Sequence, residues 1–150
     1  MVGKEDVFPG TEVVEKSVIR RYVAAVGDTN PLYTDEEYAR KAGYDGIIAP
    51  PTFVFDVNIR IDAPVGEDGR PMARVTLPPP LSKIARAGNE YEFHKPARVG
   101  DIISTRRKIT NIFEREGRTG QLVFVEYDIY YTNQRQELLG INHERLVFFK

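Results

Sequence analysis

The chain has 150 residues and a formal net charge of -1, with 21 Lys and Arg against 22 Asp and Glu. This balance argues against nucleic-acid binding, which needs a basic excess or a concentrated basic face. The absence of cysteine excludes disulfides, thiolate nucleophiles and cysteine zinc sites, as expected for a protein of the reducing cytoplasm. The length suits a single domain over residues 1–150, and no apolar run approaches the ~20 residues that span a bilayer. The N-terminal "MVGKEDVFPG" lacks an apolar signal core, so we expect a soluble cytoplasmic protein.

Two short helices are predicted in the first third of the chain. Ser17 is a typical N-cap for a helix through "VIRRYVAAV", and Gly27 is a natural stop. Thr34 and Glu37 form a capping-box pattern for the second helix, "DEEYARKA", which Gly43 ends. The apolar stripe of the first helix comprises Ile19, Tyr22, Val23 and Val26.

A third helix is predicted from about Pro51, because proline is tolerated in the first turn of a helix, although the β-branched residues of "TFVFDVNIRI" also permit a strand. Glycine and proline then mark residues 63–72 and 77–82 as loop. Four β-like segments follow at 89–99, 101–117, 121–133 and 137–149, separated by short turns. We therefore predict an α+β fold whose four consecutive strands form an antiparallel meander, with one helix packed against the sheet.

The stretch "GDTNPLY" resembles the signature of the hydratase-2 (MaoC-like) family, an aromatic residue followed by Gly-Asp-x-Asn-Pro-Leu-His. The segments "IIAPPTF", "NEYEFHKPARVGD" and "FVEYDIYYTNQRQELL" are similar to the N-terminal MaoC-type dehydratase domain, which also occurs as a partner subunit of bacterial 3-hydroxyacyl-thioester dehydratases. The positions that match the signature are Tyr22, Gly27, Asp28, Asn30, Pro31 and Leu32.

This resemblance implies a hot-dog fold, in which a curved antiparallel sheet wraps around one long helix and two units pair as a double hot dog. It also implies reversible addition of water to a trans-2-enoyl thioester of coenzyme A or acyl carrier protein, giving the (R)-3-hydroxyacyl product without a cofactor. The motif aspartate and histidine handle the water and the α-proton in the family. The candidate site residues here are Asp28 and, as a replacement for the missing base, His94 for catalysis, and Asn30, Tyr33, Pro51, Thr52 and Phe53 for substrate binding.

Position 33 departs from the family signature. Tyr33 stands where active members have histidine, and a phenol with a pKa near ~10 is not a ready base at neutral pH, whereas histidine at ~6.5 is. A tyrosine there resembles the partner-type domains, which take their chemistry from a second unit. Asp28 has two interpretations, a site carboxylate or a residue of a Gly-Asp-x-Asn-Pro turn, and Asn30 fits the structural role better.

A second departure concerns the donor to the thioester carbonyl, which in the family is a backbone N–H at the start of the central helix, usually from glycine. Pro51 occupies the corresponding position and has no N–H. The donor must then come from Thr52, from Phe53 or from a partner's helix.

The two histidines are far apart in the sequence and show no metal-ligand spacing, so no metal is predicted. His94 can replace the missing base only if it faces inward. Strand alternation instead groups it with Glu90 and Glu92 on the polar face, opposite Tyr91 and Phe93. His143 is interpreted as a strand-surface or interface residue.

Three hypotheses remain. The first is an acyl-tail-binding unit with a degenerate site, which forms a homodimer or a heterodimer with a catalytic MaoC-like subunit. The second is a self-sufficient homodimeric hydratase that uses Asp28 with His94 or a water molecule. The third is a non-enzymatic acyl-thioester binding module or a thioesterase, for which Asp56 is the carboxylate to check. A basic run at residues 106–108 either meets phosphates of coenzyme A or an acidic carrier, or is simply a solvated face.

Overall fold

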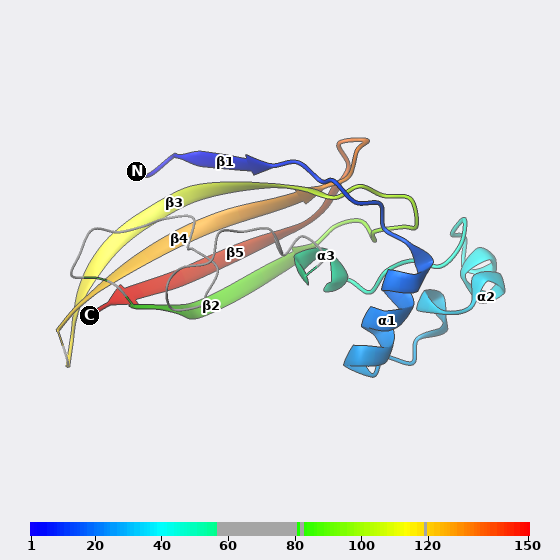
Figure 1. Ribbon diagram of the computed structural model, residues 1–150, viewed down its shortest axis with the longest axis horizontal. Helices are drawn as coiled ribbons and strands as arrows, with labels where there is room; N and C mark the ends of the chain where they lie inside the picture. The colour runs from blue at the N-terminus through cyan, green and yellow to red at the C-terminus, as the bar shows by residue number, and fades with distance from the viewer. Residues whose placement is uncertain (57–80, 82, 119) are drawn as a thin grey trace.

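A computed structural model describes residues 1–56, 81, 83–118 and 120–150. Its strands form one antiparallel five-stranded sheet in the order β1-β3-β4-β5-β2. Figure 1 shows a long, curved sheet with the helices α1 and α2 together beyond one of its ends. The strands are β1 Glu5–Phe8, β2 Lys83–Phe93, β3 Ser104–Gly117, β4 Gly120–Thr132 and β5 Leu138–Phe149; the helices are α1 Lys16–Val26, the 3₁₀ turn η1 Pro31–Tyr33, α2 Glu36–Lys41 and α3 Phe53–Asp56.

The sheet is curved and antiparallel with few helices, as the α+β hot-dog prediction requires, but the predicted four-strand meander is wrong in one connection. β3, β4 and β5 are joined by hairpins, whereas β2 pairs with β5 instead of β3. The segment between β2 and β3 does not form a hairpin but pairs with the chain before α3. The Ala49 N–H donates to the Ala97 carbonyl at 2.8 Å, and Ile48 forms an isolated β-bridge with Arg98. The free side of β3 is taken by β1, a strand that the sequence did not predict.

The first helix ends as predicted but begins with a different residue. Gly27 closes α1 with a φ of 71°, a left-handed conformation that favours glycine. The N-cap is Glu15, whose side chain makes no cap hydrogen bond, and Ser17 lies inside the helix, where its hydroxyl donates to Glu15 Oε2 at 3.1 Å. Ser17 is therefore not the cap.

The second helix is capped one residue later than the capping-box pattern predicted. Asp35 Oδ1 accepts from the N–H groups of Glu37 and Tyr38 at 2.9 and 3.0 Å, so one carboxylate satisfies two donors of the first turn. Thr34 closes η1 instead. α2 ends at Lys41, and the chain then turns at Gly43, whose φ is 93°.

α3 begins at Phe53, two residues after the predicted start, and the Phe53 N–H donates to the Pro50 carbonyl at 3.0 Å. The prediction of a longer helix beyond Asp56 and of loops at 63–72 and 77–82 concerns residues outside the described range, apart from Leu81. No helix in the described part of the chain has both the length and the apolar character to cross a lipid bilayer.

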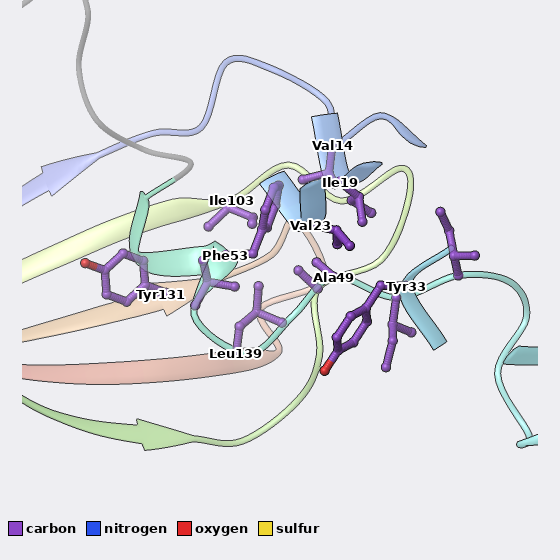
Figure 2. Packing of buried hydrophobic residues seen from close by; sticks show 13 residues of the cluster. Val14, Ile19, Val23, Tyr33, Ala49, Phe53, Ile103, Tyr131 and Leu139 are labelled. Atoms are coloured by element: carbon purple, nitrogen blue, oxygen red, sulfur yellow. The ribbon is translucent and has the colours of Figure 1, made fainter. Parts of the chain in front are cut away.

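Buried apolar side chains form two clusters. The first lies where the helices meet the sheet, and Figure 2 shows Ile19 and Val23 of α1 gathered with Phe53, Tyr131 and Leu139. The second lies farther along the sheet and comprises Ile109, Val123, Val125, Tyr127 and Phe148. Ile129 is partly buried and packs against both clusters. The first cluster positions the signature turn and α3 relative to the sheet.

Candidate functional site

The signature turn is built from two consecutive side-chain-to-backbone bonds. Asp28 Oδ1 accepts from the Asn30 N–H at 2.9 Å, and Asn30 Oδ1 accepts from the Leu32 N–H at 3.1 Å. This is the turn chemistry expected of Asp and Asn beside proline. Asp28 is exposed, so its carboxylate both shapes the turn and faces solvent.

Tyr33 follows this turn and is buried, with only 7% of its surface exposed. Burial raises the pKa of its phenol and the Asp28 carboxylate raises it further, while a hydrogen bond with the Asn30 side chain acts in the opposite direction. Tyr33 therefore stays protonated at neutral pH. The structure brings Asp28, Asn30 and Tyr33 together in one turn.

The entrance to α3 combines a buried Pro50 with an exposed Pro51. The Phe53 N–H already donates to Pro50, and the Phe55 N–H donates to Thr52 at 3.1 Å. Of the two predicted donors to a thioester carbonyl, Thr52 is therefore the better placed, because Phe53 is engaged in the turn.

A polar triad links this entrance to α1. The Tyr22 hydroxyl contacts Thr52 Oγ1 at 2.8 Å and Asp56 Oδ2 at 3.1 Å, and its ring meets Phe53 edge-on at 5.4 Å. Burial raises the pKa of Tyr22, the bond to Thr52 lowers it, and Asp56 raises it. Sequence reasoning missed this triad. The available signal was the four-residue spacing of Thr52 and Asp56, which places both on one helix face.

An aromatic group covers the inner face of the sheet beside α3. The Phe55 ring lies 4.4 Å from Tyr91, 5.0 Å from Tyr131 and 5.7 Å from Phe93, measured between ring centroids. Tyr91 and Phe93 are 39% and 53% exposed. Apolar walls of this kind suit an acyl chain.

Both histidines lie on the outer face of the sheet. His94 Nε2 is 3.4 Å from Glu92 Oε2, while His143 lies between Glu92 at 2.9 Å and Asp128 at 2.6 Å. The hydrogen bond to Glu92 raises the pKa of His143 most, and the hydrogen bond to Asp128 raises it further. Because Glu92 alternates with Tyr91 and Phe93, this network is on the side away from Phe55. The structure does not bring His94 together with Asp28 within one chain.

The basic run of β3 divides between the two faces. Arg106 pairs with Glu5 at 3.1 Å and lies over the Tyr130 ring, and Lys108 shares Glu5 at 3.9 Å. Arg107 is buried on the inner face. Within the described residues, no cluster of three His, Asp or Glu side chains has a geometry suited to a metal ion.

Comparison with known proteins adds sequence relatives and similar folds. A family model described as "FAS1-like, dehydratase domain region" matches residues 1–140. A UPF0336 protein of Streptomyces avermitilis is 34% identical over 107 residues, which cover 70% of this chain and 67% of that protein. A probable enoyl-CoA hydratase alpha subunit of Thermomonospora curvata is 30% identical over 148 residues, covering 94% of this chain but 46% of that protein.

Solved structures share the fold at lower sequence identity. The ChsH1-ChsH2 complex from Mycobacterium tuberculosis gives a TM-score of 0.77 at 22% identity, over 97% of this chain and 83% of that chain. A MaoC-like dehydratase from Rhodospirillum rubrum gives 0.71 at 24%, over 100% and 93%. The HadBC (3R-hydroxyacyl-ACP dehydratase) complex from M. tuberculosis gives 0.66 at 23%, over 98% of each chain.

The curved sheet and the signature turn together define a MaoC-like hot-dog dehydratase domain. The chain belongs to the hydratase and dehydratase family described by the FAS1-like dehydratase domain model, which matches residues 1–140.

Proposed function

We propose that this chain is the acyl-tail-binding unit of an (R)-specific enoyl-thioester hydratase or 3-hydroxyacyl-thioester dehydratase. The observation that carries the proposal is Tyr33, which stands at the base position of the signature, buried and with a raised phenol pKa. Hydration needs a group that exchanges a proton near neutral pH, and this phenol does not. Pro51 removes a second element, the usual backbone donor to the thioester carbonyl.

The partner in this proposal is a catalytic MaoC-like subunit, which supplies the aspartate–histidine pair and the carbonyl donor. Two of the similar structures are complexes, ChsH1-ChsH2 and HadBC. The long edge strand β2, with exposed Tyr91 and Phe93, offers this chain a surface for pairing. The substrate is an acyl thioester of coenzyme A or acyl carrier protein.

In this division of labour the chain positions its substrate without reacting with it. The partner's base would deliver water to the β-carbon, and its acid would return the proton to the α-carbon. This chain holds the tail against the aromatic group around Phe55. Such binding raises the rate by orienting the thioester, because immobilising a reactant removes part of the entropic barrier.

The test is a hydration assay on the purified chain, alone and with a co-purified catalytic MaoC-like subunit, following the loss of enoyl-thioester absorbance. We expect no turnover by the chain alone, turnover with the partner, and little effect of Asp28→Asn in this chain on that turnover. Turnover by the isolated chain that Asp28→Asn abolishes would instead make it a self-sufficient hydratase. The outward position of His94 argues against that outcome.

A second candidate function, thioester hydrolysis, is favoured by Asp56 at the first turn of α3. Its carboxylate accepts a hydrogen bond from Tyr22 beside Thr52, so a carboxylate on the helix is held in a defined orientation. A free-thiol assay with acyl-coenzyme A distinguishes the two functions. Thiol release that Asp56→Asn removes would support the thioesterase.

A further inference from the structure

A row of polar side chains crosses the inner face of the sheet between the two apolar clusters. Arg107 of β3 aligns with Ile129 of β4, and Ile129 aligns with Asn142 of β5. Glu144 is the next inward position of β5 after Asn142. We call Arg86, Arg107, Asn142 and Glu144 the polar strip. Its position is unusual, because the rest of this face is largely apolar.

The charges of the polar strip are paired at close range. Glu144 is only 7% exposed and accepts from Arg86 Nε at 3.1 Å, while Arg107 Nη2 lies 3.6 Å from its second oxygen. The Arg107 guanidinium also lies 3.6 Å over the centre of the Tyr127 ring. These contacts hold the Arg107 side chain in place, but they do not use all of its N–H donors.

Two atoms of the polar strip are buried without a partner. Among the described residues, no group bonds Nε of Arg107 or Oδ1 of Asn142, although the two residues are only 9% and 6% exposed. Buried polar atoms are almost always hydrogen-bonded, and an unpaired one is destabilising. One atom is a donor and the other an acceptor.

Both side chains open on the same cavity. It has a volume of about 260 Å³, and its lining includes Arg107, Asn142 and Glu144 together with Phe55 and Asp56 of α3. Asp56 belongs to the triad at the entrance of α3. The cavity therefore joins the unpaired atoms to the aromatic wall proposed to hold the acyl tail.

We propose that this cavity binds an acyl tail bearing a hydroxyl group, recognised by Arg107 and Asn142. This inference rests on the proposed tail-binding function and specifies its substrate class. A hydroxyl accepts from Arg107 Nε or donates to Asn142 Oδ1, so it suits either unpaired atom. A saturated tail satisfies neither. A carboxylate suits Arg107 but meets the unpaired oxygen of Asn142 and the carboxylate of Asp56, and the two arginines of the lining are already shared with Glu144.

The test is calorimetric binding of decanoyl-coenzyme A, its mid-chain and terminally hydroxylated forms, and the matching dicarboxylic thioester to the purified chain. We expect at least one hydroxylated form to bind about tenfold or more tightly than decanoyl-coenzyme A, because a site built for a hydroxyl discriminates against its absence. Asn142→Leu or Arg107→Lys should bring the ratio of the two affinities, hydroxylated over plain thioester, close to one. Asn111→Leu is the matched control, since Asn111 is exposed and bonds Glu126. Arg107→Lys keeps the positive charge opposite Glu144, so it can test the proposal if Asn142→Leu does not fold.

The outcomes separate this inference from the proposed function. Equal binding of plain and hydroxylated thioesters overturns the inference and leaves tail binding intact. A preference for the dicarboxylic thioester also overturns it. Binding of no thioester at all contradicts both proposals.

Discussion

At the scale of single residues, the signature turn is hydrogen-bonded although Tyr33 stands where the family signature has histidine. The side-chain oxygens of Asp28 and Asn30 accept hydrogen bonds from the backbone N–H groups of Asn30 and Leu32, a role that does not depend on catalysis. Tyr33 fills the buried position that follows. The turn is thus maintained by bonds that a noncatalytic domain also needs, and its presence alone does not define an active site.

Restoring the missing groups should create activity. Tyr33→His returns a base with a pKa near ~6.5, and Pro51→Gly returns a backbone N–H at the start of α3. We expect Tyr33→His alone to remain near the wild-type background, and the double variant to exceed it about a hundredfold, given the usual contributions of general base and oxyanion donor. The measurement is enoyl-coenzyme A hydration by the isolated chain. A double variant as inactive as wild type, though folded, would show that further groups are missing.

His143 gives a residue-scale prediction on the outer face. Its pKa is raised by hydrogen bonds to Glu92 and Asp128, so its charged form is favoured by folding. The resulting stability is present below the unfolded pKa of ~6.5 and is lost as pH rises through the higher folded value. We expect NMR titration to place His143 above ~6.5, and Glu92→Gln to lower its midpoint. A His94→Asn background leaves one histidine signal to assign, and an unchanged midpoint in Glu92→Gln would contradict the assigned cause.

At the scale of elements, the contact between α3 and β5 depends on a glycine. A Cβ placed on Gly140 would lie 3.0 Å from the Glu92 carbonyl oxygen and 3.1 Å from Phe55 Cζ. Any larger residue therefore pushes Phe55 away from the sheet. The close packing of Phe55 against β5 therefore requires that this position carry no side chain.

Gly140→Ala should accordingly be destabilising. Overpacking of a filled contact costs about 1–3 kcal/mol, and we expect that range in the free energy of unfolding measured with urea. Gly88→Ala is the control, because a Cβ there meets no atom within 4 Å. Its effect should stay within about 0.5 kcal/mol. Equal losses in both variants would show that the contact with Phe55 does not set the cost, because backbone entropy alone favours alanine over glycine.

The elements also show how far local sequence information reaches. Gly27 marked the end of α1 because a left-handed residue is a local requirement. The caps were misplaced by a residue or two, since Asp35 competes with Thr34 for the same donors. β1 is too short to show a periodic pattern, and the pairing of β2 with β5 is decided by contacts distant in sequence. For the same reason Asp28 and Tyr33 were predictable as one turn, whereas the bonds joining Tyr22 to Asp56 were not.

At the scale of the whole molecule, the two edges of the sheet differ. β1 is a short edge of four residues, while β2 has eleven and is exposed along most of its length. The His94 N–H donates to the Leu139 carbonyl, so in an antiparallel ladder the N–H groups of Tyr91 and Phe93 point away from β5, toward the open edge. Within the described residues β2 has no strand on this side, and a long edge that also exposes aromatic side chains favours pairing with another strand.

We therefore expect the chain to associate through β2. Phe93→Lys places a charge at a position that is 53% exposed in one chain and removes the ring contact with Phe55, and it should weaken association strongly. Val7→Lys is a matched control on the opposite edge, where the side chain is 63% exposed. Sedimentation velocity should show wild type and Val7→Lys as dimers and Phe93→Lys shifted toward monomer. Loss of the dimer in Val7→Lys alone would place the interface at β1, and a monomeric wild type would contradict association of this chain with itself.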